Sequence, residues 1–168
     1  MRSSYFRLVM VVWIFALVAA GTWAAYRYRQ YGREDSLRRG VSALKEGKYA
    51  DAMLLVRPLA EEGDVRAAIE LGNIYALGLG VPVDDTLAQT WYERAERGGA
   101  APGTSQLDIA FEIAAGRVSS NDAGRATHWL RRAASAGNEA AKSLLADRDE
   151  LTRRGFDSDG ELLRGRAH

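Results

Sequence analysis

The stretch Ala68–Gly99 reads AIELGNIYALGLGVPVDDTLAQTWYERAERGG and decides the fold. In its second half, apolar residues recur at helical spacing, at Leu87, Ala88, Trp91, Tyr92 and Ala95. This period predicts an amphipathic helix. We expect Asp84 to cap the start of that helix with its side-chain oxygen, and Gly99 to end it in the left-handed conformation.

A second apolar stripe precedes this helix, at Leu71, Ile74, Tyr75 and Leu77. Its spacing also predicts a helix. The run Gly78-Leu79-Gly80-Val81-Pro82 would end it, because glycine and proline are unfavourable inside helices. The stretch therefore predicts a helix, a short glycine loop, a second helix and a glycine turn.

The same pattern occurs three times along the chain. The small, bulky and glycine positions of Ala52–Gly63 align with Ala88–Gly99 at a shift of 36 residues, and with Ala126–Gly137 at a further 38. Asp84 and Asp122 both lie four residues before the matched alanine, where each can cap a helix. One helix pair cannot bury its apolar face alone, but stacked pairs can. We therefore predict an all-α solenoid of about three helix pairs plus a capping helix.

Residues 68–99 also carry the pattern of a known repeat almost whole. The matching positions are Ala68, Leu71-Gly72, Tyr75, Gly78, Gly80-Val81, Asp84, Ala88, Trp91-Tyr92, Ala95 and Gly99. In these residues the chain resembles the Sel-one-like repeat family, a relative of the tetratricopeptide repeats. The unit at 103–137 departs from the pattern in its first helix, where Asp108 and Ala114 replace glycines.

The resemblance implies a right-handed superhelix of antiparallel helix pairs that presents a surface to protein partners, and it implies no catalysis. In such solenoids the first helix of each pair lines the concave side. The protein-binding residues that we expect there are Glu70, Asn73 and Leu77 and, 36 residues later, Gln106, Ile109 and Ile113. The alternative is that Leu77, Ile109 and Ile113 are buried between units.

An apolar run occupies the amino-terminal part of the chain. Within Leu8–Ala25 only Gly21 and Thr22 are not apolar. As a helix these residues would span about 27 Å, close to the thickness of the hydrocarbon layer of a bilayer. We predict a transmembrane helix or signal anchor over 8–27. The alternative is a cleaved secretory signal with a cleavage site at Val18-Ala19-Ala20.

Aromatic and basic residues flank this run, as they do at membrane interfaces. Arg27, Arg29 and Arg33 follow it and are candidates for contact with lipid headgroups. Solvated arginines at a helix end are the equal alternative.

We divide the chain accordingly. A short segment, 1–7, precedes the predicted membrane helix 8–27, and a juxtamembrane linker, 28–36, leads into the solenoid, 37–151. The solenoid consists of units 37–63, 67–99 and 103–137 and a capping helix over 139–151. A flexible polar tail, 152–168, completes the chain.

Two arguments about membrane orientation disagree. Arginines are more numerous after the apolar run than before it, which favours a cytoplasmic solenoid. A short basic amino terminus before an apolar run is typical of export signals and uncleaved signal anchors. We expect a single-pass protein of the bacterial inner membrane with its solenoid on the periplasmic side, and the cytoplasmic side is the alternative.

Composition excludes several classes of function. The formal net charge is +1, and the first 27 residues hold three arginines and no acid, so the remainder carries −2. This balance of charge gives no excess of basic residues of the kind that binds nucleic acid. Cysteine is absent, which excludes disulfides, a cysteine nucleophile and thiolate metal sites, and two histidines nearly exclude a multi-histidine metal site. We expect no cofactor and no small-molecule substrate.

Three weaker signals have structural explanations. Gly78-Leu79-Gly80 lacks the third glycine of a phosphate-binding loop and follows a helix, so we interpret it as an interhelical turn. Phe156–Glu161 is similar to part of a calcium loop, but Gly155 and Arg166 would occupy positions that need oxygen ligands. His128 has no carboxylate in its own helical turn, which favours a surface histidine over a general base. The sequence therefore predicts no enzyme.

The combined prediction is a membrane-tethered protein–protein interaction module or scaffold, such as an accessory or assembly subunit of a membrane protein complex. The alternative is an exported cell-envelope regulator of an enzyme, released after signal cleavage.

Overall fold

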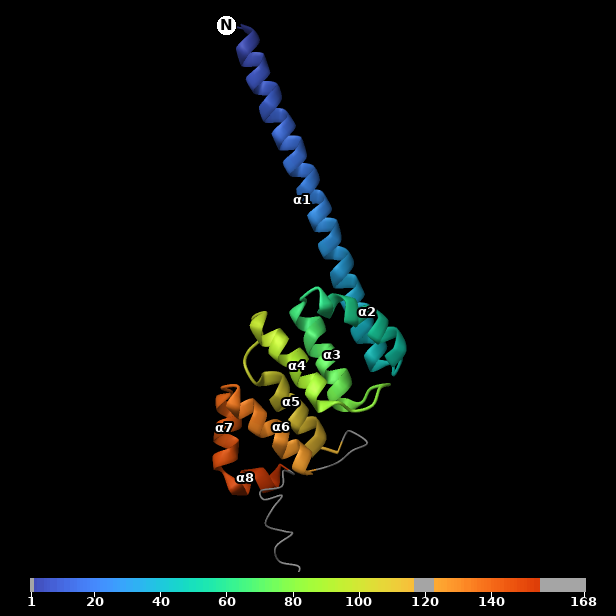
Figure 1. Ribbon diagram of the computed structural model, residues 1–168, viewed down its shortest axis with the longest axis vertical. Coiled ribbons are helices and arrows are strands. Elements are labelled where there is room, and N and C mark those ends of the chain that lie inside the picture. The colour runs from blue at the N-terminus through green and yellow to red at the C-terminus, as the bar shows by residue number, and fades with distance from the viewer. Residues whose placement is uncertain (1, 117–122, 155–168) are drawn as a thin grey trace, which may run out of the picture.

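The computed structural model of the chain describes residues 2–116 and 123–154, and these consist of helices and turns. Side chains are described for the same residues except 2–9, 11, 12, 123, 148, 149 and 152. One long helix, α1 (Arg2–Lys45), projects from a stack of shorter helices (Figure 1). These are α2 (Tyr49–Glu61), α3 (Val65–Leu77), α4 (Asp85–Arg97), α5 (Thr104–Ala114), α6 (Ala123–Ser135), α7 (Glu139–Ala146) and α8 (Arg148–Arg153).

The helices pack in pairs that follow the order of the chain. α1 packs on α2, α3 on α4 and α5 on α6, and α2 with α3 and α6 with α7 join successive pairs. The fold is therefore an α/α solenoid, as the repeat pattern predicts. Each pair is needed by its neighbour, because the shorter helices α2 to α7 bury apolar residues against adjacent helices.

The helix α1 belongs to this stack only at its carboxyl end. Its 44 residues make it about 66 Å long, and Leu37 is its first buried residue. A Cβ atom added at Gly40 would lie 2.7 Å from Cγ2 of Val56, so α1 and α2 approach each other closely there. The first half of α1 extends beyond the stack without a neighbouring helix (Figure 1).

Residues 28–36, predicted as a linker, are helical and continue α1 without a break. Contacts one turn apart along the helix support this continuity. Arg27 donates a hydrogen bond to the Tyr31 hydroxyl at 2.7 Å, and Gln30 donates one to the Tyr26 hydroxyl at 3.0 Å. Such i, i+4 pairs stabilise a helix that has no neighbour.

Among the residues that the structure describes, no helix has a stretch both long and apolar enough to cross a membrane. The side chains of 8, 9, 11 and 12, which belong to the predicted membrane helix, lie outside the described residues, as do those of the predicted segment 1–7.

Side-chain caps begin several helices. The predicted cap at Asp84 is confirmed, because its Oδ1 accepts a hydrogen bond from the Leu87 amide at 2.8 Å. Asp64 caps α3 and Asn138 caps α7 in the same way. Asp122, the second predicted cap, lies outside the described residues.

The predicted capping helix over 139–151 is divided into α7 and α8. Asp147 lies between them in an extended conformation, with φ −105° and ψ 95°. Its Oδ1 accepts a hydrogen bond from the amide of Glu150 at 3.0 Å and so begins a new helix.

Small residues allow the helices to approach one another. Ala88, Ala95, Ala126 and Ala133 are buried, and Trp129 and Tyr92 fill the space beside them. The two rings meet edge to face with centroids 5.6 Å apart. This pair lies at the junction of the second and third helix pairs and joins them in one core.

We predict that Gly72→Ala destabilises the second helix pair. A Cβ at position 72 would lie 2.7 Å from Cδ1 of the buried Tyr92 ring, and overpacking of this kind costs about 1–3 kcal/mol. Thermal unfolding of the detergent-solubilised chain, followed by circular dichroism, measures the loss. Gly32→Ala is the control, because it lies in α1 with open space around it. An equal melting temperature for wild type and Gly72→Ala would contradict this packing.

Candidate protein-binding surface

A groove of about 500 Å³ lies between the first helices of the first two pairs, α1 and α3. Leu37 and Val41 of α1 provide its apolar part. Its remaining lining is polar or charged and consists of Glu34, Arg38, Ser42 and Lys45 of α1 and Arg66 and Glu70 of α3. The groove therefore combines an apolar strip with charges of both signs, which suits a protein segment better than a small apolar ligand.

Two helices position the charged side chains of this groove. Arg66 at the start of α3 makes an ion pair with Glu34 of α1. Arg33, one residue earlier, lies 3.6 Å from Glu62 and 3.9 Å from Asp64, measured from nitrogen to oxygen. These contacts join α1 to the start of α3 and to the turn before it.

Glu70 is a partly buried acid of the groove. Burial raises the pKa of its carboxyl above the ordinary value, although a hydrogen bond from Asn73 and the charge of Lys45 act in the opposite direction. No ion pair to Glu70 is present among the described residues. A partly buried carboxylate without a paired cation would gain from a basic side chain supplied by a partner.

Asn73 connects Glu70 to the core. Its Nδ2 donates to Glu70 Oε2 at 3.4 Å, and its Oδ1 accepts a hydrogen bond from the Tyr92 hydroxyl at 2.8 Å. Tyr92 is fully buried, so this chain of hydrogen bonds fixes the amide and orients the carboxylate.

Of the residues predicted for binding, only those on α3 remain accessible. Glu70 and Asn73 are half-buried, and Leu77 is half-buried against the core. Gln106, Ile109 and Ile113, also predicted for binding, are buried between helices in this structure. Ile109 and Ile113 lie in the core as the alternative expects, and Leu77, the third residue of that alternative, packs against the core while partly exposed.

The contacts of α5 with α4 accompany this difference. Glu96 Oε1 on α4 accepts hydrogen bonds from the Gly103 amide and from Gln106 Nε2, both at 2.9 Å. These bonds join the start of α5 to α4. Gln106 is buried there, whereas Glu70, one repeat earlier, reaches the groove.

The prediction also missed one wall of the groove, which α1 supplies. A signal for it was present in the sequence, because Glu34, Arg38, Val41 and Lys45 follow one another at helical spacing. The first helix of the first unit matches the repeat pattern less closely than α3 does, so the pattern alone does not place these residues.

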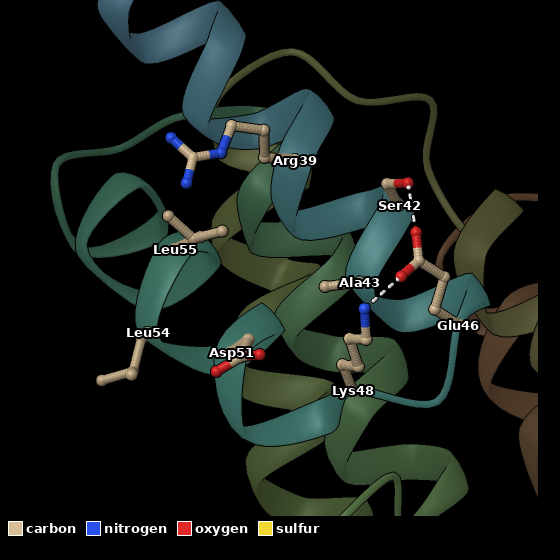
Figure 2. A pocket seen from close by; sticks show the side chains of 8 residues that line it. All are labelled: Arg39, Ser42, Ala43, Glu46, Lys48, Asp51, Leu54 and Leu55. Atoms are coloured by element: carbon tan, nitrogen blue, oxygen red, sulfur yellow. Dashed lines mark hydrogen bonds and ion pairs between the residues drawn. The ribbon is translucent and has the colours of Figure 1, made fainter.

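A second hollow, of about 430 Å³, lies at the outer side of the first helix pair, between α1 and α2 (Figure 2). Three of its polar side chains are paired with one another: Lys48 Nζ lies 2.7 Å from Glu46 Oε2, and Ser42 donates to Glu46 Oε1 at 3.1 Å. Leu54, 75 % exposed, points away from it into solvent (Figure 2). The groove that holds Glu70 is therefore the stronger candidate.

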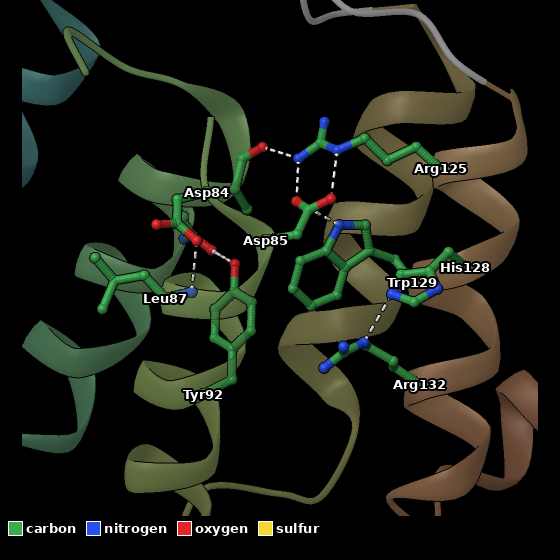
Figure 3. A network of polar contacts seen from close by, with 10 residues as sticks. Asp84, Asp85, Leu87, Tyr92, Arg125, His128, Trp129 and Arg132 are labelled. Carbon is green, nitrogen blue, oxygen red and sulfur yellow. Dashed lines mark hydrogen bonds and ion pairs between the residues drawn. The ribbon is translucent and has the colours of Figure 1, made fainter. Parts of the chain in front are cut away.

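A buried polar network joins the second pair to the third (Figure 3). Arg125 of α6 makes a two-point ion pair with Asp85 of α4, with Nε 2.8 Å from Oδ2, and donates to the Ala76 carbonyl. Trp129 Nε1 donates to Asp85 Oδ1 at 3.1 Å. The network fixes the angle between the pairs and thus the shape of the solenoid.

The weaker motifs have structural roles or lie outside the described residues. Gly78 and Gly80 have φ of 68° and 72°, and Gly80 packs against Tyr49, so this segment is the predicted interhelical turn. His128 is exposed and accepts a hydrogen bond from Arg132 Nε at 2.8 Å (Figure 3). The calcium-loop candidate Phe156–Glu161 and most of the predicted polar tail lie outside the described residues.

The three arginines predicted at lipid headgroups differ in their surroundings. Arg27 stacks on the rings of Trp23 and Tyr31, with its guanidinium 5.3 and 5.2 Å from their centroids. Arg33 faces the acids of the α2–α3 turn. Arg29 has no ion pair among the described residues.

Comparison with known proteins identifies two repeats in the chain. The family model described as Sel1 repeat matches residues 65–99 and 105–138. Among solved structures, the chain is similar to a Sel1 repeat protein from Oxalobacter formigenes, with 32% identity and a TM-score of 0.42 over 68% of this chain and 88% of the other. No curated protein matches the sequence.

We predict that Asp85→Ala loosens the junction between the second and third pairs. The Arg125 side chain is 11% exposed, so loss of its carboxylate leaves a largely buried guanidinium without its ion pair. The expected loss is about 3 kcal/mol of unfolding free energy, measured by urea denaturation of the detergent-solubilised chain. Asp51→Asn, on the exposed side of α2, is the control and should lose less than about 0.5 kcal/mol. Equal losses in both variants would contradict a structural role for the network.

Proposed function

We propose a function for this chain from the premise that it belongs to the Sel1 repeat family, whose repeats generally mediate protein–protein interaction. The chain is a membrane-tethered interaction module. Its solenoid holds a protein partner at the α1–α3 groove, and α1 anchors it in the bacterial inner membrane. This arrangement suits a scaffold, or an accessory or assembly subunit of a membrane protein complex.

The groove supports the protein-binding part of this proposal. One observation carries it: Glu70 is held in place by Asn73, lies in a groove with an apolar strip, and has no paired cation among the described residues. A partner with a lysine or arginine beside an apolar side chain would complement both features. The proposed partner is thus a basic, amphipathic protein segment.

The amino-terminal part of α1, as far as Tyr31, supports the membrane part. Its described side chains from Met10 onward include large apolar and aromatic groups that are more than half exposed: Met10, Trp13, Ile14, Phe15, Leu17, Val18, Trp23, Tyr26, Tyr28 and Tyr31. Exposure of so many large apolar groups in water is unfavourable, and a bilayer would remove that cost. The apolar run Leu8–Ala25 has the length that a bilayer requires.

We predict that Glu70→Gln stabilises the free chain at pH 7 but not at pH 4. Because burial raises the pKa of Glu70, the charged carboxylate costs folding free energy. That cost is absent below the ordinary pKa near 4.5 and develops as the pH rises through the raised pKa. Melting temperatures of wild type and variant at both pH values measure it, with exposed Glu61→Gln as the charge-matched control. No gain for Glu70→Gln at pH 7 would show that the carboxylate is satisfied in the free protein.

Charge reversal at the same position tests the partner. We expect Glu70→Lys to lose a protein that copurifies stoichiometrically with the full chain from detergent-solubilised membranes, whereas Glu61→Lys keeps it. The binding loss should be tenfold or more, of the order seen when like charges face each other in an interface. Circular dichroism confirms that both variants fold. If the folded Glu70→Lys variant still copurifies with the partner, the partner does not bind at this groove.

The anchoring is tested separately from the partner. We expect the full chain to remain in membranes after alkaline carbonate extraction and to keep its amino-terminal residues. A reporter fused to its carboxyl end should be active only when exported, because we propose a periplasmic solenoid. Extraction of the chain into the soluble fraction would contradict anchoring. A mature amino terminus after Ala20 would favour the exported regulator, and cytoplasmic reporter activity would reverse the orientation.

A further inference from the structure

A third groove, of about 570 Å³, lies where α1 leaves the stack and meets the end of α2. Ala25, Tyr28, Arg29, Gly32, Arg33 and Ser36 line it from one side of α1, at helical spacing. Leu59 and Glu62 of α2 face them. Gly32 has no atoms within 4 Å of the place where a Cβ would stand, so the middle of the groove is open.

The position of this groove along α1 places it at a definite depth relative to a membrane. The apolar run ends at Ala25, and Arg29 follows four residues later, about 6 Å farther along the helix. The headgroup region on each side of the hydrocarbon layer is about 5–8 Å thick. If α1 is inserted as proposed above, Tyr28 and Arg29 lie among the headgroups, and Ala25 lies at the start of the acyl chains.

The charge of the groove favours an anion. Arg29 and Arg33 provide two guanidinium groups, and Glu62 provides one carboxylate. Arg33 lies 3.6 Å from Glu62 and therefore offsets its charge. Arg29 makes no ion pair among the described residues, so its guanidinium is available to a phosphate, which it can bind through two parallel hydrogen bonds.

We propose that this groove binds the headgroup phosphate of an anionic phospholipid in the leaflet that faces the solenoid. Arg29 contacts the phosphate, and Arg33 with Ser36 completes the polar side. Leu59 and Ala25 contact the first carbons of the lipid. The inference rests on the proposed insertion of α1 and adds a lipid class and a site to it. A lipid held between α1 and α2 would fix the solenoid at the membrane surface in one orientation.

Full-length chain in nanodiscs of phosphatidylcholine with one fifth phosphatidylglycerol tests this site. Native mass spectrometry of the released protein counts the lipids of each kind that stay bound. We expect phosphatidylglycerol to be enriched about fivefold over its share of the bilayer, the factor expected for one basic residue at the surface. Arg29→Gln should remove this enrichment.

Arg39→Gln is the matched control, because Arg39 is exposed on the same helix, ten residues farther from the membrane and outside this groove. It should keep the enrichment. The lipid site would be overturned, and the anchor left intact, if the wild type showed no enrichment of phosphatidylglycerol. Equal enrichment in Arg29→Gln and Arg39→Gln would overturn it too. A chain that fails to enter nanodiscs would overturn the anchor and the lipid site together. Equal binding of soluble glycerol phosphate to the detergent-solubilised chain would overturn the assignment to a lipid.

Discussion

The helices of the stack are apolar along one side, so that side can be buried only against a neighbour, and the stacking begins on the carboxyl end of α1. Gly40 allows α2 to lie close to α1, and Leu37 is the first side chain that this contact buries. From there each pair provides the surface on which the next one packs. The position of the whole solenoid is therefore set by one helix, most of which lies outside the stack.

This constraint connects the two parts of the proposed function. The helix that forms one wall of the groove at Glu70 also carries the exposed apolar and aromatic side chains. Arg33 joins it to the α2–α3 turn and Glu34 joins it to the start of α3, both by ion pairs close to where it leaves the stack. A partner bound in the groove would thus lie at a fixed height above the membrane in which we propose that α1 is inserted. No flexible segment separates anchor and groove.

The sequence predicts the solenoid well because its signals are local. Asp84 caps a helix through its own side chain, and Gly78 ends one through its own backbone conformation, so neither depends on distant residues. The binding residues are predicted less well, because a repeat register assumes that each helix is rotated alike. Gln106 is buried and donates a hydrogen bond to Glu96, and this contact joins residues of neighbouring pairs that no repeat pattern relates. The sequence does not predict that α1 continues through 28–36, because charged residues after an apolar run are compatible with either a linker or a helix. In the structure this segment is helical, and Arg33 pairs with the acids of the α2–α3 turn.

The central claim is that anchor and groove share one rigid helix. Hydrogen exchange of the amides at 28–36, measured by mass spectrometry on the full chain in lipid nanodiscs, tests it most directly. Our account predicts exchange as slow as in α3, because these amides are bonded within α1. Complete exchange within seconds, as in an unstructured segment, would contradict it.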